Sequence, residues 1–350
     1  MPRTPARRRA RRPLAAAAAA LALLLLAACG GGDDDDAAAD AGASGGASGF
    51  PVTVEHKFGS TTIPSAPQRV VALGYTELDY ALALGVTPVA ARYPQFGPTD
   101  TAVRPWAAEL AGDADVQVLE YAFGAIDTEA VAALQPDLVL AVTSGITQAE
   151  YDALSRFAPV VAQTDDYIDF GMPWQDTTRL IGQALGQPER AEELVADLEA
   201  EFAAAREEHP ELEGLEVASA SYGANEVFVF AADDLRARFF TDLGMVVPAE
   251  VEELAGDAFF GSLSLERLDL VDRDVLVWSQ LQFTEGGREA IEADPLVQAL
   301  AATREGRTVF IGGEADDALQ VSTVLSLPTA LEGVLPLLEA ATDGDPATRS

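Results

Sequence analysis

The sequence is dominated by short apolar runs that do not alternate with polar residues and that are separated by stretches of helical periodicity. The clearest runs cover residues 70–73, 137–142, 159–162, 275–278 and 308–311. A strand that is apolar throughout is buried on both faces, which is typical of parallel sheets covered by helices on each side. These runs predict an α/β protein with parallel sheets.

The expected strands form two groups on either side of a long helical region. This region covers 174–185 and 189–208, with a break at Gly186-Gln187-Pro188. In its second part, apolar residues lie on one face and acidic residues on the other; the apolar ones are Leu194, Val195, Leu198, Phe202 and Ala205. We therefore expect two parallel-sheet α/β lobes joined by a single long interlobe helix.

The expected boundaries are an N-terminal lobe over 50–172, a helical linker over 173–210 and a C-terminal lobe over 211–345. A small hairpin over 51–63 opens the first lobe, because an alternating run turns at Gly59-Ser60. Further strands are expected over 86–90, 217–221 and 227–231, and further helices over 77–84, 127–134, 148–157, 234–243, 265–270, 285–293 and 323–341.

The N-terminus predicts export. Residues 1–28 combine an arginine-rich start with an apolar stretch of about fifteen residues, which is typical of a secretory signal peptide. They end in Leu26-Ala27-Ala28-Cys29-Gly30, which resembles a bacterial lipobox. We expect lipidation of Cys29 and anchoring to the outer face of the cytoplasmic membrane; the alternative is an ordinary signal peptide with a chance cysteine.

Residues 29–49 precede the globular part and lack large apolar side chains. This composition predicts a flexible acidic tether. Export by the Sec or the Tat route stays open.

Charge and composition exclude several classes of protein. The chain has 22 basic and 57 acidic residues, and six of the basic ones lie within the first twelve positions. Without them, 16 basic residues face 57 acidic ones, a net charge of −41. Such a surface repels phosphate backbones, so we expect no nucleic-acid partner. One cysteine and two histidines, His56 and His209, exclude a multi-cysteine zinc site or a histidine cluster, and we expect no metal bound directly by the protein.

An ordered set of segments spans the globular part and carries a family resemblance. In this order they are 67–73, 77–79, 83–89, 126–140, 151–154, 158–161, 263–268, 274–276 and 306–310. With them the chain resembles the substrate-binding lipoproteins of iron-siderophore ABC transporters, the group that also includes the ferrichrome, ferric-citrate and cobalamin binding proteins. The resemblance implies a class III periplasmic-binding-protein-like fold with limited hinge motion.

The resemblance also implies a function. A monomer would capture a ferric siderophore in the cleft between its lobes and deliver it to the permease of an ABC importer. The iron would arrive already held by its chelator, so no cofactor is expected. In the family, one glutamate on each lobe docks into arginine-lined pockets of the permease, and Glu129 and Glu266 occupy these positions here. An acid in a first helical turn also stabilises the helix dipole, which is the alternative explanation.

A ferric chelate is bulky, partly apolar and often anionic, so aromatic side chains and arginines near strand ends are the candidate ligand-binding residues. They are Tyr75, Arg92, Tyr93, Tyr222, Arg236, Arg238, Phe259, Phe260, Trp278 and Gln280, with Phe239 and Phe283 beside them. The alternatives are core packing for the aromatic residues and, for Arg236 and Arg238, ion pairs with Asp233, Asp234 or Asp242.

Two other functions stay open at this point. The same architecture could bind cobalamin or haem, and a haem site would favour a tyrosine or histidine ligand. A cell-surface enzyme is the remote alternative; the chain lacks a P-loop pattern, and its one near match to a nucleophile elbow lies in the tether, so we expect no enzymatic activity. The class of siderophore is not fixed by the sequence.

Overall fold

A parallel sheet forms the centre of the N-terminal lobe. In the computed structural model, which describes residues 49–93, 101–120, 126–345 and 347, its strand order is β5-β4-β3-β6-β7. The strands are β3 (Val70–Ala72), β4 (Ala90–Arg92), β5 (Gln117–Leu119), β6 (Leu138–Ala141) and β7 (Val160–Ala162). All neighbours pair in parallel. The strand expected over 86–90 begins only at Ala90; Pro88 lacks the N–H that a ladder needs.

Helices and a hairpin cover this sheet. The helices are α1 (Glu77–Ala83), η1 (Pro105–Ala107), α2 (Ala108–Ala111), α3 (Thr128–Ala133) and α4 (Gln148–Leu154). Asp127 caps α3, and Thr147 with Glu150 forms a capping box on α4, so both helices begin where the sequence supplies acceptors for their free N–H groups. The predicted hairpin is present as β1 (Val52–His56) and β2 (Gly59–Ile63).

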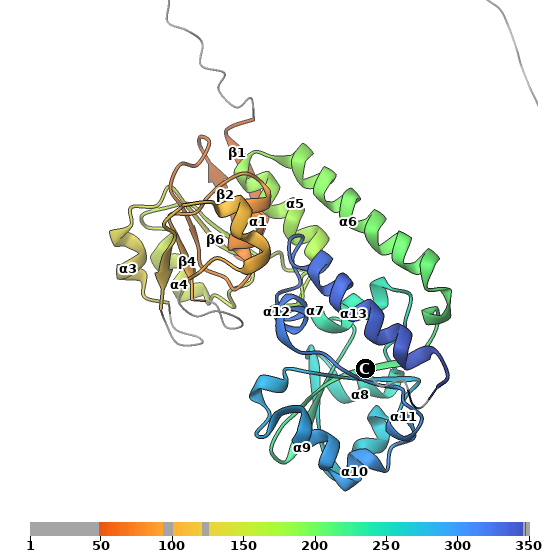
Figure 1. The fold of residues 1–350 in the computed structure, drawn as a ribbon. Helices are drawn as coiled ribbons and strands as arrows, with labels where there is room; N and C mark the ends of the chain where they lie inside the picture. Colours follow the sequence, from red (N-terminus) through yellow and green to blue (C-terminus); the bar gives the residue numbers. More distant parts are fainter. Residues whose placement is uncertain (1–48, 94–100, 121–125, 346, 348–350) are drawn as a thin grey trace, which may run out of the picture. The chain divides into compact units, whose positions relative to one another are not determined.

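Two helices carry the chain from the first sheet to the second: α5 (Trp174–Leu185) and α6 (Pro188–Glu208). Gly186 separates them in the left-handed conformation, and Gly182 lets them pack closely, since a Cβ there would lie 2.4 Å from the Cβ of Ala191. In Figure 1, α6 is the long green helix that runs alongside both lobes. Its buried face, which includes Phe202, packs against Phe239 at a ring-centroid distance of 5.7 Å.

The C-terminal lobe contains a sheet of equivalent order, β10-β9-β8-β11-β12. Its strands are β8 (Val217–Tyr222), β9 (Glu226–Phe230), β10 (Phe260–Ser264), β11 (Val275–Ser279) and β12 (Thr308–Phe310). β8, β11 and β12 pair in parallel, whereas β9 is antiparallel to both of its neighbours. The sheet is therefore mixed, because the short connection from β8 to β9 makes a hairpin and cannot form a crossover.

The helices of this lobe are η2 (Pro210–Leu212), α7 (Leu235–Asp242), α8 (Ala249–Ala255), η3 (Leu265–Val271), η4 (Leu281–Phe283), α9 (Gly287–Ala293), α10 (Pro295–Gln298), α11 (Ala301–Arg304), α12 (Gly313–Val321) and α13 (Leu327–Thr342). The single helix expected over 323–341 is preceded by a separate one, α12. A turn divides them: Ser322 has φ 47°, and Thr323 and Ser326 each accept the other's backbone N–H through their hydroxyls.

The two α/β lobes with sheets of the same strand order confirm the predicted fold class. The predicted domain boundaries stay predictions. The signal peptide, Cys29 and most of the tether lie outside the described residues. Within the described part of the chain, no helix combines the length and the apolar content that crossing a membrane requires.

Candidate functional site

A pocket of about 210 Å³ lies between the two lobes. Its lining comes mostly from segments that follow the carboxyl ends of β3, β6 and β11 and from helices α7 and α12. The lining residues are Tyr75, Thr76, Thr143, Phe170, Asp234, Leu235, Arg236, Phe259, Gln280 and Gln320. Parallel strands end at one edge of a sheet, so the loops of each lobe meet there, which is where α/β proteins usually bind their ligands.

Aromatic side chains form a row across the pocket. Phe170 lies between the other two: its ring centroid is 6.1 Å from that of Tyr75 and 6.5 Å from that of Phe259. Phe170 itself has φ 69°, an uncommon conformation for a bulky residue. Gly145 makes room for its ring, since a Cβ at that glycine would lie 2.8 Å from Phe170 Cζ. The row thus joins a loop of the N-terminal lobe, the segment before α5 and a loop of the C-terminal lobe.

Arg92 stacks on Tyr75. Its guanidinium carbon lies 3.7 Å from the centroid of the tyrosine ring, and the arginine is only 7% exposed. Burial raises the pKa of Tyr75, and the positive charge of Arg92 partly offsets that rise. The phenol therefore stays protonated at neutral pH and presents a flat aromatic face with an O–H group.

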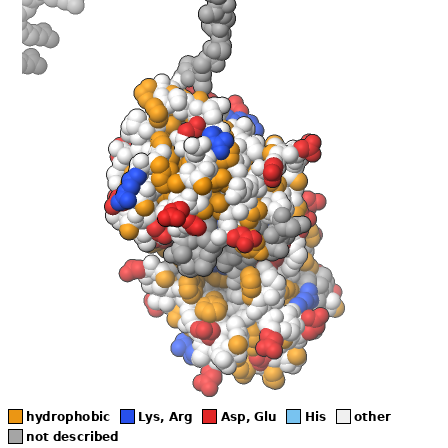
Figure 2. Space-filling model, turned by 90° about the vertical axis from the view of Figure 1, so that its left-hand side faces the viewer, with side chains coloured by type: hydrophobic (Ala, Val, Ile, Leu, Met, Phe, Trp, Pro, Cys, Tyr) orange, Lys and Arg blue, Asp and Glu red, His pale blue; other side chains and the backbone are white. Residues whose placement is uncertain are grey.

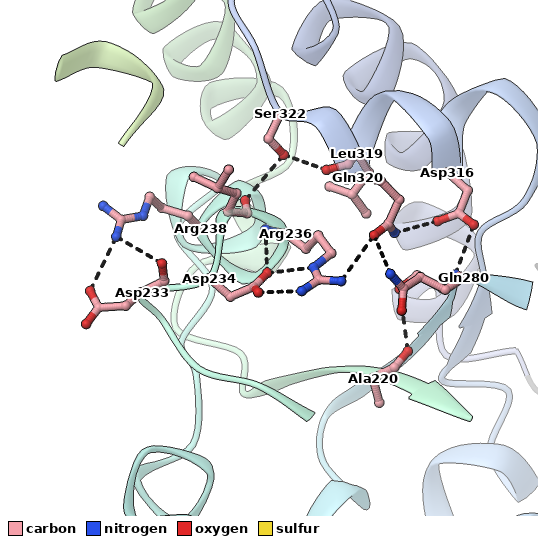
Figure 3. A network of polar contacts seen from close by, with 12 residues as sticks. Ala220, Asp233, Asp234, Arg236, Arg238, Gln280, Asp316, Leu319, Gln320 and Ser322 are labelled. Atoms are coloured by element: carbon pink, nitrogen blue, oxygen red, sulfur yellow. Dashed lines mark hydrogen bonds and ion pairs between the residues drawn. The ribbon is translucent and has the colours of Figure 1, made fainter. Parts of the chain in front are cut away.

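The opposite wall is polar and centred on Arg236 (Figure 3). The Asp234 carboxylate, which caps α7, accepts from Arg236 Nε at 2.7 Å and from Nη2 at 2.5 Å. The guanidinium also lies 3.6 Å from the ring centroid of Phe230, and its Nη1 donates to Gln320 Oε1 at 3.2 Å. Asp234 is 3% exposed, so this bidentate pair is held away from water in one geometry.

Two amides and a buried carboxyl continue this wall. Gln280 Nε2 donates to Gln320 Oε1 at 2.9 Å, and Gln320 Nε2 donates to Asp316 Oδ1 at 2.9 Å (Figure 3). Asp316 also accepts the backbone N–H of Gln280, which has a left-handed φ of 59° directly after β11. Burial raises the pKa of Asp316 to about 6. The network fixes the amide of Gln280 at the pocket.

A buried glutamate holds the pocket loops of the N-terminal lobe together. Glu77 Oε1 accepts the backbone N–H of Thr143 at 2.7 Å, and its Oε2 accepts that of Thr76 at 3.1 Å. Gly74 permits this approach, since a Cβ there would lie 2.0 Å from the carboxylate oxygens. The side chain is fully buried, and this desolvation raises its pKa to about 7 even though the N–H bonds favour the charged form.

A second buried acid links the lobes. Asp79 Oδ2 accepts from Trp106 Nε1 at 2.7 Å and from the Thr323 hydroxyl, in the turn between α12 and α13, at 2.8 Å. Burial raises the pKa of Asp79, and its hydrogen bonds and the charge of Arg104 act against that rise. The N-terminal lobe is thus tied to the α12–α13 turn by a hydrogen bond that is inaccessible to water.

The structure places the predicted ligand-binding residues in three locations. Tyr75, Arg236, Phe259 and Gln280 line the pocket, and Arg92 lies behind Tyr75. Tyr93 is half-buried directly after β4 and is not among the lining residues. Arg238 donates to the Gly171 carbonyl at 3.1 Å and pairs with Asp233 at 3.3 Å, beside a different hollow. For Arg236 and Arg238, the ion pairs that the sequence suggested are present.

The other predicted aromatic residues lie outside the pocket for reasons of packing. Trp278 is fully buried in the core of the C-terminal lobe, because its side chain points into the sheet's covered face, and Tyr222 packs on it at a ring-centroid distance of 5.6 Å. Phe239 is buried against Phe202. Phe260, in the edge strand β10, packs on Phe228 of β9. Phe283 is 60% exposed on η4.

Several residues of the site were not predicted: Phe170, Thr76, Thr143, Gln320 and Glu77. Thr76 and Thr143 follow strands β3 and β6, so their position after a strand could have identified them. Phe170 lies in a segment without periodicity, and Gln320 lies within a helix. Neither carries a signal in the sequence alone.

The two predicted docking glutamates occupy equivalent positions in the two lobes. Glu129 lies in the first turn of α3 and follows the edge strand β5; Glu266 lies in the first turn of η3 and follows the edge strand β10. Both are exposed. Among the described residues, neither carboxylate makes a hydrogen bond or an ion pair.

The histidines lie away from the pocket. His56 is 6% exposed and bonds Thr61 at 2.9 Å, and His209 follows α6 and bonds Glu211 at 3.1 Å. Within the described residues, no group of three or more histidine, cysteine or acidic side chains is arranged to hold a metal ion.

Known proteins with similar sequences share this architecture. The family described as periplasmic binding protein matches residues 70–315. The ferric-anguibactin-binding protein FatB of Vibrio anguillarum is 26% identical over 281 residues, which cover 76% of this chain and 81% of FatB. The ferric enterobactin-binding periplasmic protein FepB of Escherichia coli is 26% identical over 294 residues, which cover 77% of this chain and 86% of FepB.

Solved structures of other binding proteins share this fold. A periplasmic solute binding protein from Mycobacterium smegmatis superimposes with a TM-score of 0.73 and 34% identity, covering 83% of this chain and 98% of that one. PiaA of Streptococcus pneumoniae, in complex with ferrichrome, superimposes with a TM-score of 0.73 and 29% identity, covering 84% of this chain and 99% of that one.

The raised pKa of Glu77 predicts a pH-dependent stability. The folded state holds a proton that the unfolded state releases, so between about pH 4.5 and about pH 7 the free energy of unfolding falls as the pH rises, by on the order of 3 kcal/mol from this residue. We expect Glu77→Gln, which resembles the protonated form, to lose that contribution, as measured by urea unfolding at both ends of this range.

The matched control is Glu252→Gln, an exposed glutamate that also accepts a backbone N–H, from Ala232 at 2.8 Å. This variant is expected to keep the wild-type pH dependence. Parallel pH profiles for the wild type and Glu77→Gln would contradict the assignment.

Proposed function

Because the chain belongs to the periplasmic binding protein family, we propose that it captures a ferric siderophore in the pocket between its lobes and delivers it to an ABC importer. The observation that carries the proposal is the pocket itself. An aromatic row lies on one side, and Arg236, paired with Asp234, lies with two glutamine amides on the other. Relatives and structural neighbours named for ferric siderophores support it.

The pocket's chemistry suits a chelate with apolar arms and a polar coordination shell. Tyr75, Phe170 and Phe259 offer flat apolar surface, and Arg236 and Gln280 offer N–H donors for ligand oxygens. The cavity is smaller than the roughly 300–1,000 Å³ of most ligand pockets. We infer that the chelate is gripped over part of its surface and extends beyond the cavity.

The alternatives fit the site less well. A haem ligand would need a histidine or a tyrosinate, but both histidines lie away from the pocket, and burial raises the pKa of Tyr75. The names of the relatives favour ferric siderophores over cobalamin. The family and these relatives are binding proteins and not enzymes.

The aromatic row makes a direct prediction. We expect Phe170→Ala to weaken binding of a recognised ferric siderophore by about 10- to 100-fold, because a buried ring that contacts apolar ligand surface contributes roughly 1.5–3 kcal/mol. The measurement is quenching of the intrinsic protein fluorescence during titration with ferric siderophores.

The matched control is Phe157→Ala, which removes a 38% exposed ring after α4, outside the pocket. It should leave the affinity unchanged. Equal affinities for Phe170→Ala and the wild type would place the ligand elsewhere.

We also propose that Glu129 and Glu266 dock to the permease. Each carboxylate is exposed and has no partner among the described residues. Each lies in the helix that comes directly after the edge strand β5 or β10 along the chain. The two lobes therefore present one acceptor each for bidentate bonds from arginines of a permease. Stabilisation of the helix dipole would explain the presence of an acid at each position, but it would not give that acid a role in docking.

We expect the double variant Glu129→Arg and Glu266→Arg to lose uptake of the ferric siderophore while its affinity in solution stays unchanged. The control is Glu189→Arg with Glu289→Arg: both are exposed glutamates in first helical turns, of α6 and α9, so the cost to the helix dipole is matched. Uptake assays in cells and titrations of purified protein separate the two steps. Normal uptake by the first variant would rule out the docking role.

We further propose that the protein is a monomer anchored through lipidated Cys29 to the outer face of the cytoplasmic membrane. The lipobox-like sequence supports this, as do relatives named lipoproteins.

Substitution Cys29→Ser is expected to release the exported protein into the soluble fraction, because the acyl chains can no longer be attached. Fractionation of cells and mass spectrometry of the mature N-terminus measure this. A Cys29→Ser variant that stays membrane-bound after removal of residues 1–28 would contradict the anchor.

A further inference from the structure

The charges at the pocket are balanced by contacts within the protein. Arg236 is the one cationic side chain among the described lining residues, and Asp234 accepts two of its N–H groups, at 2.7 and 2.5 Å. The Asp234 side chain is 4% exposed and that of Arg236 is 14% exposed. The pair therefore brings no net charge to the pocket. Of the five guanidinium N–H groups, Asp234 accepts two and Gln320 accepts one, which leaves two for a ligand oxygen.

Two further cations of this region are also paired with acids. Arg238 pairs with Asp233 at 3.3 Å, and Lys57 pairs with Asp169, next to Phe170, at 2.5 Å. The buried Arg92 lies behind Tyr75, and the buried Asp316 lies behind Gln280 and Gln320 on the other side.

No additional cation can come from the two internal stretches that the structure does not describe. Residues 94–100 and 121–125 contain neither lysine nor arginine.

The whole surface disfavours anions. Beyond the first twelve residues the chain has 16 basic residues against 57 acidic ones. Figure 2 shows acidic side chains spread over one face, with fewer basic ones among them. A field of this sign lowers the local concentration of anionic ligands and slows their association.

Ferric siderophores differ in net charge according to their chelating groups. Three monoanionic hydroxamates neutralise a ferric ion, whereas three dianionic catecholates leave three negative charges on the complex. Moving such a trianion against a pocket lining that carries no net positive charge removes part of its hydration without replacing it, which is unfavourable. A neutral complex meets no such cost.

On the basis of the proposed function, we propose that the pocket selects ferric hydroxamates of zero or positive net charge and rejects ferric tris-catecholates. Asp234 is the residue that sets this selectivity, because it cancels the charge of Arg236 and leaves the guanidinium as a hydrogen-bond donor. Hydroxamate oxygens accept from Arg236 and Gln280, while the arms of the chelate lie on Tyr75, Phe170 and Phe259.

The first test titrates the purified protein with neutral ferrichrome, cationic ferrioxamine B and anionic ferric enterobactin at low and high salt. We expect both hydroxamates to bind at least about 100-fold more tightly than ferric enterobactin. The affinity for neutral ferrichrome should change less than about twofold with salt, whereas that for cationic ferrioxamine B should fall as salt rises, because screening acts on net charges. Tighter, salt-sensitive binding of ferric enterobactin would overturn the inference but uphold the proposed function. Binding of none of the three would overturn both.

The second test is Asp234→Asn. Asparagine keeps the cap on α7 but frees the charge of Arg236, so we expect affinity for ferric enterobactin to rise about tenfold or more. The matched control, Asp233→Asn, removes a 72% exposed acid from the adjacent ion pair and should leave this affinity unchanged. An Asp234→Asn protein that folds, as judged by circular dichroism, and binds ferric enterobactin like the wild type would overturn the role of Asp234.

Discussion

The pocket depends on one buried carboxylate. Glu77 lies at the start of α1, yet its side chain turns back to accept the backbone N–H groups of Thr76 and Thr143, which follow two neighbouring strands. Without it, these two donors would be buried without partners, and the two loops would be joined only by the Tyr75 N–H to Thr143 carbonyl bond and the bond between the hydroxyls of Thr76 and Thr143. Its desolvation is the cost of this arrangement, and the absence of a side chain at Gly74 makes it possible.

The two lobes contribute different chemistry to the same cavity. The N-terminal side and the segment before α5 supply aromatic faces, and the C-terminal side supplies a hydrogen-bonded network from Asp234 to Asp316. Hydrogen bonds hold the polar side chains of the network to one another, and each ring of the aromatic row lies against the next. Asp79 joins the sides through Thr323. A site with such fixed walls discriminates by shape and charge.

Much of the fold could be predicted, because doubly buried strands leave an unmistakable apolar run and imply parallel pairing. The strand β9 was predicted, but its antiparallel direction was missed, although its connection to β8 is too short for a crossover. Within the site, Tyr75 and Gln280 were found because they follow strands. Trp278 also lies at a strand end, but its side chain points into the core, and burial of that kind is decided by the covering helices. Phe170 reaches the pocket only through tertiary packing.

Phe170 lies between β7 and α5 and so belongs to neither sheet. Its backbone has a conformation that a bulky residue adopts only when its surroundings impose it, and its ring rests on Gly145 on one side and faces Phe259 on the other. The aromatic row is thus completed by a residue outside both sheets, whose ring is held by a loop of one lobe and faces a loop of the other.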